Sequence, residues 1–201
     1  KEEVDFLAMH KKNVTFETTP QHLTLYAPDC YDKLGTYAQM NPPLRTKEHY
    51  DRLWMAVKNN IVDVLGSDHA PHLKKNKDKK YPNSPSGMPG VQTIFPVMID
   101  HVNNGKISLE HLIKLMCENP CKIFGIKNKG FIKEGYDADL TIVDMNKEQI
   151  IKNEMIVSKC GWTPFNNYKV KGFPVGTIIN GHLVMSEGKI ISKAQGQPLK
   201  F

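Results

Sequence analysis

The sequence predicts an α/β fold with parallel strands, followed by a smaller β-rich part. Segments with helical periodicity alternate with short apolar runs in the first part of the chain, which is typical of a parallel sheet covered by helices. Polar side chains follow three strand candidates, at His22, Asn41 and Asp68. Since the strand ends of a β/α barrel carry its chemistry, this placement favours a barrel with a site at that end.

The individual elements follow from periodicity and capping signals. The helix candidates are residues 1–13, 46–60, 91–104, 108–118 and 120–124, and the strand candidates of this part include residues 14–18 and 61–66. Thr46 and Ser108 precede two of the helix candidates and are expected to cap them. The run at 61–66 is short and wholly apolar except for Asp63 and Gly66, as in buried parallel strands.

The character of the chain changes near residue 129. Gly130 and Gly135 precede a strand candidate at 139–143, and Asn180-Gly181 joins two later apolar runs. Asn-Gly between apolar runs predicts a hairpin with a type I′ turn. We therefore expect an α/β domain over residues 1–128 and a small β-rich domain with a C-terminal tail over 129–201.

The composition is that of a soluble globular protein, with 40% hydrophobic and 24% charged residues among 201. No apolar run approaches the roughly 18–20 residues that a membrane helix needs, and no signal peptide is visible. The four cysteines are scattered without the spacing of a zinc ribbon. They are expected to be free thiols, which favours the cytoplasm.

The formal charge of +6 raises the question of nucleic-acid binding. Much of it comes from residues 73–81, "LKKNKDKKY", a run with few apolar anchors. This run predicts a solvated, mobile loop and no nucleic-acid partner. The functional alternative is that residues 73–85 form a lid over a site.

The stretch "VLGSDHAPH", residues 64–72, places Asp68, His69 and His72 at the end of an apolar run. An acid after a strand is commonly a cap or a turn former. Here the nearby histidines and the rigid Pro71 favour a second reading, in which the carboxylate is a metal ligand and a general base.

Three further segments have a structural and a functional reading. His22 is either a satisfied histidine or a zinc ligand. Asn41, in "QMNPPLRT", lies either in a loop closing onto a helix or in a binding site for a carboxylate or amide, and Arg45 has the same alternatives. The segment "SPSGMPGVQT", residues 84–93, leaves backbone N–H groups free to face a ligand, although many loops look alike.

Taken together, these segments resemble the dihydroorotases, within the amidohydrolase superfamily of metal-dependent β/α-barrel hydrolases. The resemblance rests on "TPQHL", "NPPLR", "SDHAPH", "SGMPGVQT", "GFIKEGYDADLTIVD" and "CGWTPF", in that order, and covers essentially the whole chain. "NPPLR" followed by "DHAPH" is the most specific pair. The resemblance implies that residues 1–128 are the C-terminal half of a (β/α)8 barrel.

The resemblance also implies roles for particular residues. His22 matches a zinc ligand after the sixth barrel strand, and Asp68 matches the acid after the eighth, a zinc ligand that also shuttles the proton. Asn41 and His72 match residues that bind the carboxylate and ring of the substrate, and Pro89 and Gly90 lie where backbone groups meet the ring. Gln21 stands where the family often has a histidine. For His69 we expect a structural hydrogen bond beneath the site.

The family's His-x-His pair, its bridging Lys or Asp and a further His are absent from these 201 residues. Zinc needs about three or four protein ligands, and His22 and Asp68 supply two. We therefore expect one or two Zn²⁺ ions, with the remaining ligands from the N-terminal half of the same protein.

The function implied is a dihydroorotase, an enzyme that interconverts N-carbamoyl-L-aspartate and L-dihydroorotate in pyrimidine biosynthesis. The expected partner is this small substrate, with a homodimer or an aspartate transcarbamoylase complex as a further possibility. Two alternatives stay open: a dihydroorotase-like scaffold without catalysis, and a related cyclic amidohydrolase such as an allantoinase or hydantoinase.

Overall fold

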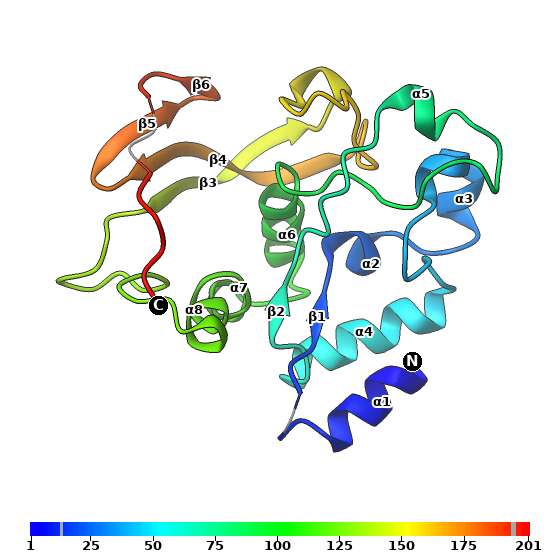
Figure 1. Cartoon of the computed structure of the whole chain (residues 1–201), viewed down its shortest axis with the longest axis horizontal. Coiled ribbons are helices and arrows are strands. Elements are labelled where there is room, and N and C mark those ends of the chain that lie inside the picture. Colours follow the sequence, from blue (N-terminus) through cyan, green and yellow to red (C-terminus); the bar gives the residue numbers. More distant parts are fainter. Residues whose placement is uncertain (13, 194–195) are drawn as a thin grey trace. The chain divides into compact units, whose positions relative to one another are not determined.

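The computed structural model describes residues 1–12, 14–193 and 196–201 as a mixture of helices and strands (Figure 1). These residues form two compact units, residues 1–97 with 150–169 and residues 98–149 with 170–201. The two units interleave along the chain. The expected domain boundary between residues 128 and 129 stays a prediction. Within the described residues, no helix has the length and apolar character required to span a membrane.

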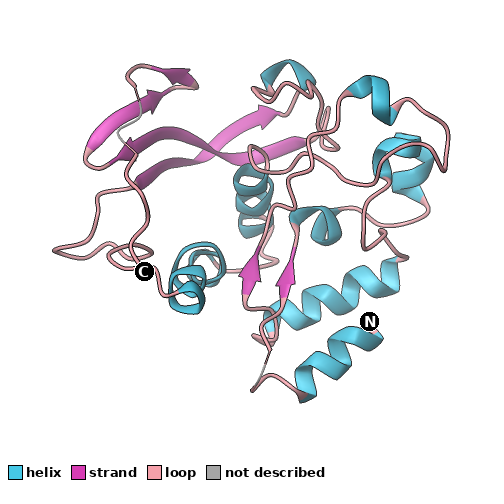
Figure 2. Ribbon diagram, viewed as in Figure 1, coloured by secondary structure: helices cyan, strands magenta, loops and turns pink. Residues whose placement is uncertain are grey.

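The first unit contains a parallel pair of short strands with helices around it (Figure 2). Its elements are α1 (Glu2–Met9), β1 (Glu17–Thr18), α2 (Pro20–Thr24), α3 (Asp29–Leu34), a 3-10 turn (Gly35–Ala38), α4 (Lys47–Lys58), β2 (Val64–Leu65), α5 (Lys74–Lys77) and a 3-10 turn (Asn153–Met155). β1 and β2 are parallel, with Glu17 opposite Val64 and Thr18 opposite Leu65. The predicted α/β arrangement is therefore confirmed, with strands shorter than the apolar runs that predicted them.

The helices of this unit are held by buried contacts between their apolar faces. Trp54 of α4 is only 5% exposed, and its indole Nε1 donates to the carbonyl of Leu23 in α2 at 3.0 Å. Thr46 stands at the predicted N-cap of α4, but its side chain makes no capping hydrogen bond. Burial of the amphipathic face, more than the cap, fixes this helix against α2.

The expected strand before Asn41 is wrong. Residues 35–38 form a 3-10 turn and 39–42 are irregular, and β1 pairs directly with β2. The backbone groups of this segment bond outside any strand ladder, since the amide of Gln39 donates to the Thr36 carbonyl at 3.1 Å and its carbonyl accepts from the amide of Gly87 at 2.9 Å. The segment is nevertheless anchored, since Ala38 and Met40 belong to a buried cluster with Trp162.

The prediction of a solvated, mobile loop at residues 73–81 is also wrong in one respect. Residues 74–77 form the helical turn α5, and the side chain of Lys77 is completely buried. The other lysines of the run are exposed, as expected. One lysine of this run is therefore buried, which the composition of the run did not predict.

The remaining helices and strands belong wholly or mostly to the second unit. They are α6 (Ile94–Asn103), α7 (Leu109–Ile113), α8 (Asn119–Phe124), β3 (Leu140–Ile150), β4 (Lys169–Ile179), β5 (His182–Ser186) and β6 (Lys189–Ile190), with a π-helical turn (Lys114–Glu118) between α7 and α8. The strands form one sheet in the order β3-β4-β5-β6. The predicted cap of α7 is confirmed, because Ser108 Oγ accepts from the amide of His111 at 3.1 Å.

The predicted hairpin at Asn180-Gly181 is confirmed. The two residues connect the antiparallel strands β4 and β5, and both have positive φ, 47° and 80°, as a type I′ turn requires. Elsewhere in this unit, a Cβ at Gly172 of β4 would lie 2.1 Å from Ile99 Cγ2. Glycine at this position therefore allows β4 to lie close against α6.

Candidate active site

A cavity of about 600 Å³ lies in the first unit, where the carboxyl ends of β1 and β2 meet. It is lined by residues that include Glu17, His22, Asn41, Pro42, Arg45, His49 and Asp68. Since parallel strands end at the same edge, pairing of β1 with β2 explains how residues 46 positions apart reach one cavity. The structure thus brings together three of the predicted site residues, His22, Asn41 and Asp68.

His22 is held by its own helix and by the Asn41–Pro42 loop. Thr19 caps α2, and its Oγ1 lies 2.8 Å from Nδ1 of His22. The other ring nitrogen, Nε2, lies 3.0 Å from the carbonyl oxygen of Pro42, to which it donates. Burial lowers the pKa of His22, while the Pro42 carbonyl and the charge of Asp68 oppose this change. The neutral ring that burial favours is the form that binds metal ions.

Asp68 follows β2 with its backbone in the left-handed region, at φ 41°. Asp tolerates this conformation better than most residues. Its side chain is exposed, and no hydrogen bond or ion pair to it is seen within the described part of the chain. The carboxylate is therefore available to a metal ion, a water molecule or a substrate in the cavity.

Glu17 is a cavity residue that sequence reasoning missed. Its carboxylate lies over Gly66, where a Cβ would be only 2.2 Å from Glu17 Oε1. Glycine at position 66 thus makes room for an acid from the neighbouring strand. A glycine at a strand end, opposite a strand that carries an acid, is the signal that sequence reasoning did not use.

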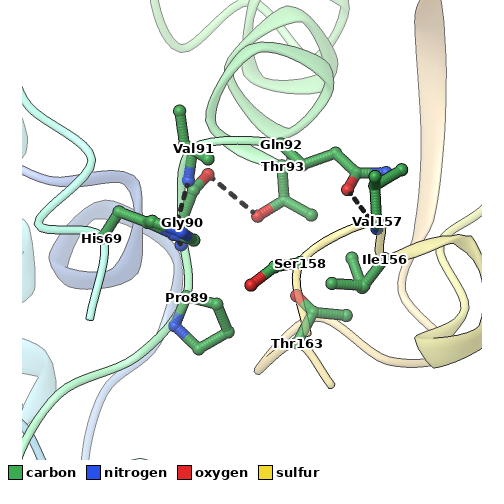
Figure 3. A pocket seen from close by; sticks show the side chains of 10 residues that line it. All are labelled: His69, Pro89, Gly90, Val91, Gln92, Thr93, Ile156, Val157, Ser158 and Thr163. Carbon is green, nitrogen blue, oxygen red and sulfur yellow. Dashed lines mark hydrogen bonds between the residues drawn. The ribbon is translucent and has the colours of Figure 1, made fainter. Parts of the chain in front are cut away.

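Pro89 and Gly90 line a second cavity of the first unit, of about 390 Å³ (Figure 3). Its lining comprises His69, Pro89, Gly90, Val91, Gln92, Thr93, Ile156, Val157, Ser158 and Thr163. Here the side chains of His69, Gln92 and Thr93 have hydrogen-bond partners in the backbone. Nδ1 of His69 accepts from the amides of Gly90 and Val91 at 3.1 and 3.4 Å. The expected structural hydrogen bond of His69 is therefore present.

Gly90 is placed by close contact with the strand end that carries Asp68. A Cβ at Gly90 would lie 2.3 Å from the carbonyl oxygen of Ser67 and 2.9 Å from Nε2 of Gln21. Gln21 is fully buried, and its Nε2 donates to that same Ser67 carbonyl at 3.0 Å. Gln21, which stands where the resemblance expects a histidine, thus serves as packing beneath the site.

His72 lines neither cavity. Its Nε2 donates to the carbonyl of Ser86 at 2.9 Å, and its own carbonyl accepts from the indole of Trp162 at 2.7 Å. Among the described residues, no three His, Cys, Asp or Glu side chains gather into a group that could hold a metal ion. The roles of His22 and Asp68 as metal ligands therefore stay a prediction.

Residues 5–184 match the model of the Amidohydrolase family. The chain belongs to the amidohydrolase family. Its matches among curated amidohydrolases include the dihydroorotase of Pyrococcus furiosus, 44% identical over 92% of this chain and 42% of the relative. Another is the dihydroorotase of Methanosarcina acetivorans, 39% identical over 89% of this chain and 38% of the relative. The chain thus spans about two fifths of the length of these relatives.

Solved amidohydrolase structures have the same fold over nearly the whole chain. The L-hydantoinase (dihydropyrimidinase) of Arthrobacter aurescens is 32% identical, with a TM-score of 0.88 over 96% of this chain and 44% of that one. The dihydropyrimidinase of Brevibacillus agri NCHU1002 is 29% identical, with a TM-score of 0.86 over 94% and 43%. The predicted fold class, part of an amidohydrolase barrel, is confirmed.

Proposed function

We propose that the protein carrying this chain is a zinc-dependent dihydroorotase, which interconverts N-carbamoyl-L-aspartate and L-dihydroorotate. One observation carries the proposal: His22, Asn41 and Asp68 line one cavity in a chain that is 44% identical to a dihydroorotase. An acid, an imidazole and an amide together match the needs of metal-assisted hydrolysis of a cyclic amide that bears a carboxylate. The roles of these residues remain proposals.

The chemistry of two side chains fits zinc. Imidazole nitrogen and carboxylate oxygen are both zinc ligands, and His22 and Asp68 follow two paired strands at one edge. The fit is partial, because a zinc site needs about three or four ligands. In addition, Nε2 of His22 would have to give up its hydrogen bond to the Pro42 carbonyl in order to bind zinc. We assign the missing ligands to polypeptide that these 201 residues do not include. Bound zinc would polarise the substrate carbonyl and lower the pKa of an attacking water.

In the hydrolytic direction, Asp68 accepts a proton from the attacking water at its free carboxylate oxygen. It then delivers that proton to the ring nitrogen as the amide bond breaks, so protons balance over the reaction. Asn41 binds the substrate carboxylate together with His72, whose Nε2 must first exchange its bond to the Ser86 carbonyl for one to the substrate. The backbone of Pro89 and Gly90 contacts the ring. For the last contact, the Gly90 amide must exchange its bond to His69 for one to the substrate.

The test is a comparison of substrates with the purified full-length protein. We expect turnover of dihydroorotate that is lost after metal removal and restored by Zn²⁺. Absence of turnover from metal-loaded, folded protein would leave a scaffold without catalysis. The hydantoinase candidate is favoured by one observation, the likeness to the Arthrobacter aurescens structure. Faster hydrolysis of hydantoin or allantoin than of dihydroorotate would support that candidate instead.

We also propose a cytoplasmic location, which is supported by four cysteines that are all free thiols. The N-terminal half of the same protein is the partner that the incomplete ligand set requires. A homodimer or a complex with aspartate transcarbamoylase stays a prediction, as does the absence of a nucleic-acid partner. Size-exclusion chromatography with light scattering, alone and with the transcarbamoylase, tests these assemblies.

A further inference from the structure

Lys77 is buried in a way that its lysine-rich surroundings do not predict. Its side chain is fully inaccessible, whereas Lys74, Lys75, Lys79 and Lys80 are exposed. The ammonium group donates to three backbone carbonyls, those of Pro85 at 2.8 Å and of Gln39 and Gly87 at 3.2 Å. Each of its three N–H groups can therefore find an acceptor.

These carbonyls belong to loops that carry the proposed substrate contacts. Gln39 lies two residues before Asn41, and Gly87 lies two residues before Pro89. Lys77 itself follows His72 by five residues. The carbonyl of Lys77 is tied as well, since it accepts from Thr36 Oγ1 at 2.6 Å and from Ser84 Oγ at 3.2 Å. One residue thus connects its own loop with the loops of Gln39 and Gly87, which are 38 and 10 residues away in the sequence.

Gly87, whose carbonyl accepts from Lys77, also lies against the "DHAPH" segment, residues 68–72. A Cβ at Gly87 would lie 2.5 Å from Ala70 Cβ and 3.3 Å from Nε2 of His72. The amide of Gly87 donates to the Gln39 carbonyl at 2.9 Å, and the amide of Ala70 donates to Met88 at 2.9 Å. Any shift of Gly87 would therefore move His72 and the Asn41 loop together.

Stability alone does not account for a lysine here. Burying an ammonium costs free energy because water must be removed from it, and this burial lowers the pKa of Lys77 to about 8. Apolar side chains of similar volume are commonly as stabilising at such positions. The benefit that lysine adds is geometric, since a compact ammonium fixes three carbonyls at defined distances.

We propose that Lys77 is a positioning residue of the substrate site, which holds the loops of Asn41, His72 and Gly90 in one arrangement. This inference rests on the proposed function for its effect on substrate. Its structural part, the fixing of three loops, is measurable without turnover.

The test compares Lys77→Met with Lys75→Met in the full-length protein. For Lys77→Met we expect KM for dihydroorotate to rise about tenfold or more, with kcat changed less than about threefold, because substrate contacts are misplaced while the metal ligands remain. Hydrogen exchange at the amides of Gly87 and Ala70 should accelerate about tenfold. Lys75 is exposed in the same run, so Lys75→Met should leave KM and exchange unchanged.

Lys77→Arg supplies a second variant if Lys77→Met fails to fold. It keeps the charge but replaces the compact ammonium by a larger, planar guanidinium group. It should also raise KM and the rate of amide hydrogen exchange. A lower thermal midpoint with unchanged KM would mean that Lys77 is only structural, and would overturn the proposal. Unchanged exchange at Gly87 and Ala70 would overturn it whether or not the wild type hydrolyses dihydroorotate. Absence of wild-type turnover with accelerated exchange would refute the function alone.

Discussion

The cavity that contains Asp68 and the cavity that contains Gly90 differ in how their polar groups are satisfied. In the cavity of His22, Asn41 and Asp68, the Asp68 carboxylate has no partner within the described residues and φ is positive at that residue. In the cavity of His69 and Gly90, side chains and backbone bond to one another (Figure 3). The exposed Asp68 carboxylate is open to a ligand, whereas the side chains of His69, Gln92 and Thr93 already have partners. The first cavity is therefore suited to chemistry, and the side chains of the second are suited to structure.

The comparison is tested most severely by Asp68→Asn in the full-length protein. Asn accepts the left-handed backbone as readily as Asp, so the fold should persist. Loss of the proton acceptor should lower kcat by about 10³-fold or more. Steady-state kinetics, with circular dichroism as the check on folding, decides the outcome. Activity within tenfold of the wild type would remove Asp68 from the proposed mechanism.

His22→Ala tests the metal part of the same cavity. Removing one ligand should lower zinc occupancy and reduce activity by about 10²-fold, a loss that added Zn²⁺ restores only in part. Elemental analysis after dialysis measures the metal directly. His10→Ala is the matched control, since His10 is exposed on the surface and lies outside the cavity. Full zinc content in His22→Ala would contradict its role as a ligand.

Asn41→Ala should weaken substrate binding without stopping the reaction. An amide that bonds a substrate carboxylate contributes about 1.5–3 kcal/mol, so KM should rise roughly 10-fold to 100-fold while kcat changes little. Asn59→Ala, at the exposed end of α4, provides the control. An unchanged KM would leave Asn41 as a loop residue, which was the structural reading of its motif.

Periodicity and turn chemistry predicted much of the fold correctly, because these signals are local. The parallel strands after residue 14 and residue 61, the Ser108 cap and the Asn180-Gly181 hairpin are all present. The strand expected before Asn41 is absent, since the backbone of Gln39 bonds within a 3-10 turn and to Gly87, a contact that no local signal predicts. The burial of the Lys77 side chain was not predictable from composition, because the carbonyls that accept from it belong to loops 8 to 38 residues away.

Some residues of the candidate site were predictable as well, because the motifs that contain them are local. His22, Asn41 and Asp68 each lie in a local motif. Strand pairing brings His22 and Asp68 together, whereas Asn41 reaches the cavity through its loop, in which the Pro42 carbonyl binds His22. The contribution of Glu17 depends on the absence of a side chain at Gly66 across the sheet, a pairing that the sequence does not reveal without the register. His72 illustrates a further limit, because its Nε2 is directed to Ser86 by a loop contact rather than by its own motif.

The smallest expected effect lies in the second cavity, at Gln92. Its Nε2 donates to the Met155 carbonyl at 2.6 Å, and its Oε1 accepts from the amide of Val157 at 2.9 Å. Gln92→Leu should therefore lower the free energy of unfolding by about 1 kcal/mol, seen as a slightly lower thermal midpoint, with kcat and KM unchanged. Gln92→Glu keeps the acceptor for Val157 and should lose less stability. A rise in KM for Gln92→Leu would show that side chains of the second cavity take part in substrate binding in addition to the proposed backbone contact of Gly90, and the distinction between a reactive and a structural set of side chains would then fail.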